Sequence, residues 1–264
     1  MEIFWRLVLG HLIGDFTLQT NYIAAWKRES IIGLLVHCLI HPLIYCILLW
    51  NYLGQVWIQF GPVPLHGWTC VAVVFAGHFV EDLWRIWSVT KKGEPDNMVF
   101  YIFDQVVHYM IIFSVSPVVD GHQGKFGMIS YPPISGILPG SAAAGLSPLQ
   151  QFFTITNPEP WVTVAILFAV VTHFTTVSIY FIEKDFFGRA FPSDREKYIG
   201  IAERVLVMAC ILLPGKLWLA VVGFWLLRSA VYKVKNIVSF SWLNLIAGNA
   251  TAVVCGVFAR FLLY

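Results

Sequence analysis

The sequence predicts an all-α fold, a polytopic transmembrane bundle of about eight helices. Of its 264 residues, 58% are hydrophobic and only 12% are charged, whereas about a quarter of the residues in a soluble domain are charged. The apolar residues also gather into runs that are long enough to cross a bilayer as helices. The formal net charge is +2 and no basic stripe is present, so we expect no nucleic-acid partner.

The apolar runs define the expected helices and divide the chain into three regions. We expect spans at residues 3–24, 31–52, 68–89, 98–116, 161–182, 198–213, 216–233 and 240–263. Residues 1–116 then form a four-helix transmembrane half, and residues 161–264 form the C-terminal transmembrane helices. The intervening residues 117–160 are rich in Pro, Gly and Ser, so an extracytoplasmic loop or a lid is expected there.

The distribution of Lys and Arg predicts the orientation of these spans. Basic residues such as Lys27, Arg28, Lys91 and Lys92 follow the first, third, fifth and seventh spans, and the alternate connections hold almost none. Cytoplasmic connections of membrane proteins carry an excess of Lys and Arg. Both termini are therefore expected on the extracytoplasmic side of the membrane.

Each of the first four spans carries a pair of metal-capable side chains spaced i, i+4. The pairs are His11/Asp15, His37/His41, His78/Asp82 and Asp104/His108. In a helix this spacing places both members on one face, about 6 Å apart along the axis. Ionisable groups at membrane depth are costly and mark functional sites, so four such pairs in consecutive spans predict a built site within the first four helices.

The order within each pair reverses as the helices alternate in direction, and this is what a shared site requires. Counting from the cytoplasmic end of each span predicts two levels. The outer level holds four imidazoles, and the inner level holds three carboxylates and one further imidazole. They are, in that order, His11, His41, His78 and His108, then Asp15, Asp82, Asp104 and His37.

This combination of donors predicts metal binding. Imidazole suits Zn and Fe, whereas carboxylates suit harder ions such as Mn and can bridge two ions. We therefore expect one or two divalent transition metals, Zn, Fe or Mn, in a dinuclear site of the kind that helical bundles build. A buried carboxylate costs about 2.5–3.5 kcal/mol on the insertion scale, and divalent ions would offset this. The alternative is that the pairs are polar contacts between helices without a cation.

Two neighbours of the pairs are candidate catalytic residues. Glu81 follows His78 by three residues and is a candidate general base or further ligand, although it could instead pair with Arg85 at i+4. Gln19 continues the helical face of Asp15 by another i, i+4 step, so it is a candidate for orienting a ligand.

Three residues of the C-terminal half are candidate substrate contacts. Arg204 and Arg228 lie near the cytoplasmic ends of their spans, and a guanidinium matches a phosphate or carboxylate. Pairing between helices with Glu203 is the alternative for these arginines. His173 lies among threonines, where it is either a hydrogen-bonded core residue or a substrate contact.

The strings that carry the four pairs resemble a known family. They are "GHLIGDFTLQT", "LLVHCLIH", "GHFVEDL" and "FDQVVHY", and "IGIAERVLV" and "LLRSAVYK" extend the similarity into the C-terminal half. The family is the bacterial membrane family designated domain of unknown function 3307. The resemblance covers most of the chain, is weakest over residues 117–160, and implies a bacterial inner-membrane location without naming a reaction.

The favoured functional hypothesis is a metal-dependent membrane hydrolase that acts on a lipid or lipid-linked phosphoester, because metals activate water and polarise phosphoryl groups. The first alternative is a di-iron membrane oxidoreductase similar to hydroxylases and desaturases, although their His-x-x-His-His spacing is absent. The second alternative is a divalent-metal transporter. A transporter needs weak, exchangeable sites, and two levels of strong ligands argue against rapid release.

Overall fold

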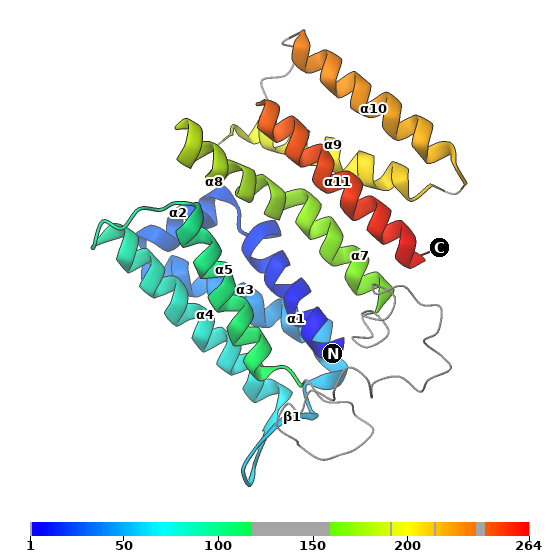
Figure 1. Cartoon of the computed structure of the whole chain (residues 1–264). Coiled ribbons are helices and arrows are strands. Elements are labelled where there is room, and N and C mark those ends of the chain that lie inside the picture. The colour runs from blue at the N-terminus through cyan, green and yellow to red at the C-terminus, as the bar shows by residue number, and fades with distance from the viewer. Residues whose placement is uncertain (1, 118–158, 191, 214, 236–240, 264) are drawn as a thin grey trace, which may run out of the picture.

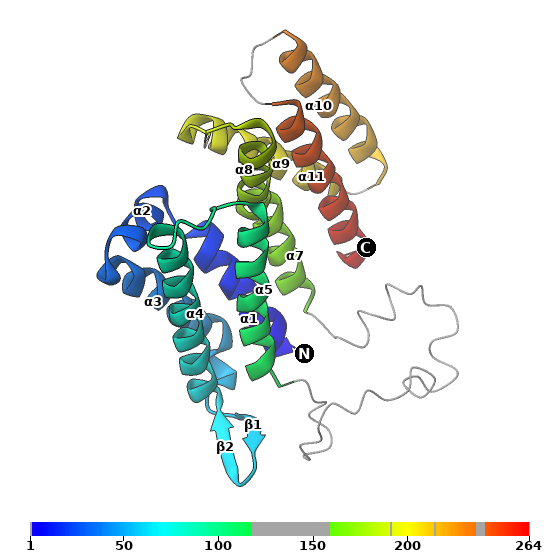
Figure 2. The ribbon, with the colours of Figure 1, turned by 60° about the vertical axis from the view of Figure 1, so that its left-hand side comes forward.

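The chain forms helices that pack as two adjoining groups (Figures 1 and 2). The computed structural model describes residues 2–117, 159–190, 192–213, 215–235 and 241–263. The expected loop or lid at 117–160 lies almost wholly outside them. Within the described ranges, five helical segments are long and apolar enough to cross a membrane, in keeping with a polytopic membrane protein. They are Ile31–Tyr52, Met98–Val115, Pro160–Phe187, Leu217–Val234 and Trp242–Leu263.

The first expected span, residues 3–24, is divided in the structure. Helix α1 (Glu2–Leu12) runs into a π-helical turn, η1 (Ile13–Thr17), and ends there. Thr20 begins a second, short helix, α2 (Asn21–Glu29), because its hydroxyl accepts a hydrogen bond from the backbone N–H of Ile23. The prediction of one unbroken helix is therefore wrong, since an N-capping threonine starts a new helix near the end of the apolar run.

Helix α3 (Ile31–Leu49) follows α2 after a single residue, and the chain folds back sharply between them. Ser30 caps α3 by accepting a hydrogen bond from the N–H of Ile32. Gly33 permits the close contact of the two helices, because a Cβ atom there would lie 2.5 Å from the carbonyl oxygen of Trp26. As a result, the last turn of α2 is held beside the beginning of α3.

Helices α4 (Gly67–Thr90) and α5 (Met98–Val115) complete a four-helix ring with α1 and α3. Helix α1 packs on α3 and α5, and α4 packs on the same two helices from the other side. Buried apolar residues from the ring, among them Leu7, Tyr45 and Ile112, form one continuous core. The ring thus turns the faces that carry the four His and Asp pairs toward one another.

The connection between α3 and α4 contains a small β-hairpin that the sequence analysis does not predict. Strands β1 (Val56–Phe60) and β2 (Val63–His66) pair in antiparallel orientation and project from one end of the ring in Figure 1. Gly61 has φ +58° at the turn, a left-handed conformation that glycine adopts without strain. β-Branched and aromatic residues flank the turn and favour strands, so the helical fold carries this one addition among the described residues.

The second group of helices begins with a long rod. Helix α7 (Pro160–Ala169) and helix α8 (Thr175–Phe187) are joined by a second π-helical turn, η4 (Val170–Phe174). The rod packs against the ring through contacts of α7 with α1 and of α8 with α5. Both π turns lie where the two groups meet, and η4 contacts η1.

The remaining three helices cover the outer side of the rod. They are α9 (Asp194–Ile211), α10 (Leu217–Val234) and α11 (Trp242–Leu263). Helix α9 starts with a capping box that Ser193 and Glu196 form with each other's backbone N–H groups. Helix α11 packs on α9 and on the rod, whereas α10 packs on α9 and α11 and lies farthest from the ring (Figures 1 and 2).

The connection between α4 and α5 fastens the two groups together at one end. The ammonium of Lys184 donates a hydrogen bond to the carbonyl oxygen of Asp96. The backbone N–H of Met98 donates to Oδ2 of Asp185 at 2.6 Å. Residues at the start of α5 are therefore tied to the last turns of α8.

Candidate metal centre

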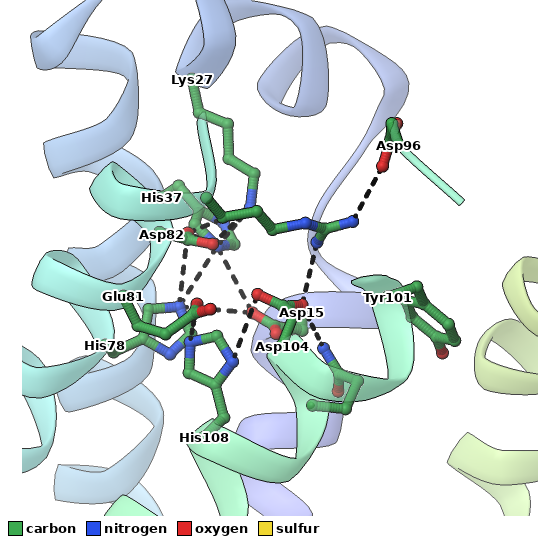
Figure 3. Close-up of polar contacts among 12 residues, drawn as sticks. Asp15, Lys27, His37, His78, Glu81, Asp82, Asp96, Tyr101, Asp104 and His108 are labelled. Carbon is green, nitrogen blue, oxygen red and sulfur yellow. Dashed lines mark hydrogen bonds and ion pairs between the residues drawn. The ribbon is translucent and has the colours of Figure 1, made fainter. Parts of the chain in front are cut away.

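The four-helix ring brings all eight candidate ligands into one buried cluster. Each side chain comes from the helix that the sequence assigns to it, and none of the eight residues is more than 8% exposed. Figure 3 shows several of them converging from α3, α4 and α5 and from the end of α1. The i, i+4 pairs thus share one depth in the bundle instead of facing lipid.

The outer level of imidazoles forms a contiguous quartet. The ring centroids of His41 and His78 lie 4.0 Å apart, and those of His78 and His108 lie 4.1 Å apart. His11 closes the set, with its ring centroid 5.1 Å from that of His108 and 5.8 Å from that of His41. One imidazole from each helix of the ring therefore lies at the same level, as the depth count predicts.

Asp15 lies at the centre of the inner level. Its Oδ1 atom is 3.0 Å from Nε2 of His41, 3.3 Å from Nε2 of His37 and 3.5 Å from Nε2 of His78. The carboxylate therefore faces imidazoles from two other helices. It reaches them from the π turn η1, and π turns of this kind frequently occur at functional sites.

Gly14, the residue before Asp15, makes room for His41. A Cβ atom on Gly14 would lie 2.4 Å from Nε2 of His41 and within 3 Å of two further atoms of that ring. No real Cβ atom approaches a ring atom so closely, so the glycine is required for the backbone of η1 to lie against the imidazole. The sequence signal for this contact is the glycine beside the aspartate in "IGDF", which the pairwise spacing argument does not use.

The buried donors fall into three groups, each of which could hold a metal ion. In each group one donor atom per residue lies within 4.8 Å of all the others. The first group is His11, Asp15, His41 and His78, the second is His37, His78 and Asp82, and the third is Glu81, Asp82, Asp104 and His108. The first and third groups share no residue, whereas the second borrows His78 from the first and Asp82 from the third.

Many of these donor atoms make no hydrogen bond within the described part of the chain. They include Nδ1 and Nε2 of His41, Nδ1 and Nε2 of His108, both carboxylate oxygens of Glu81, Oδ1 of Asp15 and Oδ1 of Asp104. A buried polar atom without a partner costs about 1–3 kcal/mol. These buried nitrogen and oxygen atoms lie close to one another, as in the 3.0 Å separation of His41 Nε2 and Asp15 Oδ1, without well-aligned hydrogen bonds, and such a cluster fits a site that is completed by cations.

Gln105, next in sequence to Asp104, joins the first and third groups. Its Oε1 atom is 3.3 Å from Nε2 of His11, and its Nε2 atom donates to Oδ2 of Asp104 at 3.0 Å. Gln19 does not continue the helical face of Asp15 as expected, because the helix ends at Thr17. Its side chain nevertheless lines the cavity beside the centre, and its Oε1 atom is buried without a hydrogen bond.

Glu81 and Arg85 do not form the i, i+4 pair that was the alternative for Glu81. Oε2 of Glu81 lies 3.3 Å from Nε2 of His108, so the carboxylate points into the third group. The guanidinium of Arg85 donates instead to Oδ2 of Asp104 at 2.9 Å and to Oδ1 of Asp96 at 3.2 Å. Arg85 thus joins the centre to the connection between α4 and α5.

Lys27 reaches the centre from α2, as Figure 3 shows. Its Nζ atom lies 3.1 Å from Oδ2 of Asp82 and 3.2 Å from Nε2 of His37. Burial alone would lower the pKa of this ammonium, but the carboxylates of Asp82, Asp15 and Asp104 outweigh that effect and raise the pKa above its ordinary value. Lys27 is therefore a charged side chain in direct contact with two candidate ligands.

A cavity of about 330 Å³ opens beside the centre, between α2 and α4 on one side and the α8 rod and α9 on the other. Asp15, Asp82 and Asp104 lie along its inner wall. Four cationic side chains also line it, namely Lys27, Arg28, Arg85 and Lys197. The inner carboxylates of the centre therefore face a cavity that is lined by both cationic and acidic side chains, the latter including Asp96.

Of the three expected substrate contacts, His173 lines this cavity and the two arginines do not. Arg204 is buried, and its guanidinium donates to the carbonyl oxygens of Val171 and Thr172 at 2.8 and 3.1 Å. Arg228 lies 4.0 Å from Glu203, the pairing that was the alternative reading. The hydrogen bonds of Arg204 are directed to the π turn η4, so this arginine stabilises the rod.

Three of the cationic side chains that line the cavity are used in the sequence analysis only to predict the orientation of the spans. Lys27, Arg28 and Lys197 belong to the basic connections that predict orientation. Their second role follows from the short helix α2 and from the start of α9, neither of which the apolar runs reveal. A threonine N-cap at Thr20 is the local signal that could have found α2.

Comparison with known proteins gives one match. Residues 3–126 match the model of a family described as "Protein of unknown function (DUF3307)". No curated protein and no solved structure matches the chain. The match covers the four-helix ring from residue 3 and contains all eight candidate ligands, and it does not extend to the C-terminal strings of the expected resemblance. Residues 3–126 therefore belong to the DUF3307 family, as the N-terminal motifs predict.

Proposed function

We propose that this protein is a metal-dependent integral membrane hydrolase that cleaves a phosphoester in a lipid or a lipid-linked substrate. The observation that carries the proposal is the pairing of two independent ligand groups with a cation-lined cavity. The first and third groups share no residue, and carboxylates of both groups line the cavity. Two divalent ions beside a space for an anion are the arrangement used for phosphoester hydrolysis.

The two groups differ in their donors, and this supports different roles. The first group offers three imidazoles and one carboxylate from α1, α3 and α4, which suits Zn or Fe. The third group offers three carboxylates and one imidazole from α4 and α5, which suits a harder ion such as Mn. A complete set of four protein ligands is typical of a structural ion, whereas a catalytic ion keeps an open position.

The open position belongs to the third group if Glu81 acts as a base and not as a ligand. Asp82, Asp104 and His108 then hold an ion, and Glu81 lies beside it with neither carboxylate oxygen in a hydrogen bond. Metal ions in such a site lower the pKa of water and polarise a phosphoryl oxygen. Glu81 would then be the carboxylate of this group that accepts the proton of the attacking water.

The reaction balances with residues of this chain. The water oxygen forms a bond to phosphorus, and its proton passes to Glu81. The bond between phosphorus and the leaving oxygen breaks, and the leaving oxygen takes up a proton from Lys27, which solvent in the cavity later replaces. Arg85 and Arg28 line the same space, and guanidinium groups match phosphate oxygens. To bind a phosphate, Arg85 would exchange hydrogen bonds that it now donates to Asp104 and Asp96.

The orientation of the chain supports a substrate from the cytoplasmic leaflet. Lys27, Arg28, Asp96 and Lys197 lie in or beside the basic connections that the positive-inside rule assigns to the cytoplasm. We propose that the cavity opens to that side, that both termini are extracytoplasmic, and that the membrane is a bacterial inner membrane. A phosphorylated headgroup would then enter the cavity while its chains remain in the bilayer.

Elemental analysis of the purified full-length protein tests the proposal. We expect close to two transition-metal ions per chain in non-chelating detergent buffer, reduced in His41→Ala and Asp104→Ala but unchanged in His66→Ala, a matched control in the hairpin. Release of inorganic phosphate from mixed micelles of a phosphorylated lipid should follow the same order. Fewer than about 0.2 ions per chain in the wild type would end the proposal. Iron with an oxygen-sensitive spectrum would indicate an oxidoreductase instead.

A further inference from the structure

The second ligand group already contains a cation of the protein itself. We propose that the ammonium of Lys27 occupies the place of an ion between His37 and Asp82, and so limits the centre to two metal ions. This inference rests on the proposed function, because it concerns the number of ions that the same centre binds. It also gives a role to a buried lysine and to a fifth imidazole that the other two groups do not use.

The contacts of Lys27 use the donor atoms that a metal would need. Its Nζ atom lies 3.1 and 3.3 Å from the two carboxylate oxygens of Asp82 and 3.2 Å from Nε2 of His37. Nε2 of His37 also lies 3.2 Å from Oδ2 of Asp82 and 3.3 Å from Oδ1 of Asp15. An ammonium has three donors and no acceptor, so in the tautomer with its proton on Nδ1, His37 accepts the hydrogen bond of Lys27 with the lone pair of Nε2. That lone pair cannot coordinate a metal ion at the same time.

The way in which the three ligand groups share residues also favours two metal ions in the wild-type centre. His78 and Asp82 are the only links of the second group to its neighbours, and each already belongs to a complete group. With ions in the first and third groups, a third ion would have His37 as its own ligand and would share Asp82 with the ion of the third group, because a carboxylate can bridge two ions. The Lys27 side chain, only 11% exposed, would meet such an ion with a like charge.

The local fold holds Lys27 in this position. Thr20 starts α2 so that Lys27 falls in its last turn, where a cation also interacts favourably with the helix dipole. Gly33 lets the backbone at Trp26 lie directly against α3, the helix that carries His37. The ammonium is therefore held in place by a capped and packed helix, and Figure 3 shows Lys27 extending to His37 and Asp82.

The test is a count of bound ions in Lys27→Met. The wild type, Lys27→Met and a control, Arg28→Met, are stripped of metal, incubated with an excess of Zn²⁺ or Mn²⁺, desalted and analysed for metal and protein. Arg28 is the adjacent basic residue of α2 and lines the same cavity without contacting His37 or Asp82 in any described hydrogen bond. We expect Lys27→Met to bind one ion more per chain than the wild type and Arg28→Met to match the wild type.

A double variant locates the additional ion. Lys27→Met combined with His37→Ala should return to the wild-type count, because the second group then lacks its own imidazole. An unchanged count in Lys27→Met, or an additional ion that persists in the double variant, would overturn the inference while leaving a two-ion wild type, and thus the proposed function, intact. A wild type without metal would instead remove the proposed function. Lys27→Gln replaces Lys27→Met if the latter does not elute as a single species from detergent.

Discussion

Nε2 of His41 lies 3.0 Å from Oδ1 of Asp15, although the two residues belong to different helices and are separated by 26 positions in sequence. The contact depends on the π turn that carries Asp15 and on the absence of a side chain at Gly14. Because the two residues are candidate ligands of the same ion, their separation sets the geometry of the first group.

Gly14→Ala should weaken metal binding without removing any ligand. The new methyl group would lie 2.4 Å from Nε2 of His41 unless the imidazole or η1 moves, and a ligand displaced in this way lowers metal affinity by about 10-fold or more. Titration of metal-free protein with Zn²⁺ measures the effect. Gly54→Ala is the matched control, since no atom lies within 4 Å of its added Cβ. Equal affinities for both variants would contradict the proposed crowding.

Gln105→Leu should also weaken the centre, through two ligands at once. Gln105 contacts Nε2 of His11 and donates to Oδ2 of Asp104, and loss of such an orienting partner lowers metal affinity by about 10–100-fold. The same Zn²⁺ titration applies. Gln59→Leu in the hairpin is the control, because its amide donates only to Gly61 among the described contacts. Retention of full affinity in Gln105→Leu would show that His11 and Asp104 are held by packing alone.

Arg85→Lys should impair substrate binding more than turnover of bound substrate. The lysine keeps the charge but cannot present the planar fork of the guanidinium to a phosphate, so we expect KM for a phosphorylated lipid to rise by about 10-fold. Arg228→Lys is the control, since Arg228 faces Glu203 and does not line the cavity. A larger rise in KM for Arg228→Lys than for Arg85→Lys would contradict this prediction. It would instead support Arg228 as the substrate contact, as the sequence analysis expects.

In metal-free protein, Lys27→Met should lower the free energy of unfolding, because the buried carboxylate of Asp82 then loses its ammonium partner and keeps only the imidazoles of His37 and His78 beside it. Breaking a buried ion pair costs about 3 kcal/mol, and the double variant Lys27→Met/Asp82→Asn should recover part of this loss. The pKa of Lys27 is raised in the folded state. Its stabilising effect is therefore fully present below the ordinary lysine pKa and is lost as the pH rises through the raised value. Unfolding in mixed micelles at pH 7 and pH 9 should thus give equal differences between wild type and Lys27→Met.

Spacing and hydropathy predict much of this molecule, because both follow from helix geometry. Helical structure is present over each expected span in the described ranges. The imidazoles of the outer level lie next to one another, as the depth count predicts. What spacing cannot predict is a departure from regular geometry. The π turn at Asp15 and the new helix after Thr20 depend on local hydrogen bonds, so the end of the first span and the place of Gln19 are wrong.

Residue spacing within one helix also cannot predict contacts between side chains that are far apart in the sequence. Arg85 could pair with Glu81 by spacing alone, yet Asp104 on α5 competes for it once the ring closes. Lys27 reads as a marker of orientation because nothing in its own sequence neighbourhood points toward Asp82. The charge of Arg204 predicts an anion contact, but carbonyl groups of η4 accept hydrogen bonds from its guanidinium.

The cavity has consequences for how such chains diversify. All candidate ligands come from the segment within residues 3–126, but the opposite wall comes from α8 and α9, which lie outside the family match. Under the proposed function, changes at His173, Tyr180 or Lys197 would therefore alter which headgroup fits without changing a candidate ligand. Relatives that keep α1 to α5 but have different C-terminal helices would be expected to keep the candidate metal ligands. Their preference for a substrate would be expected to differ.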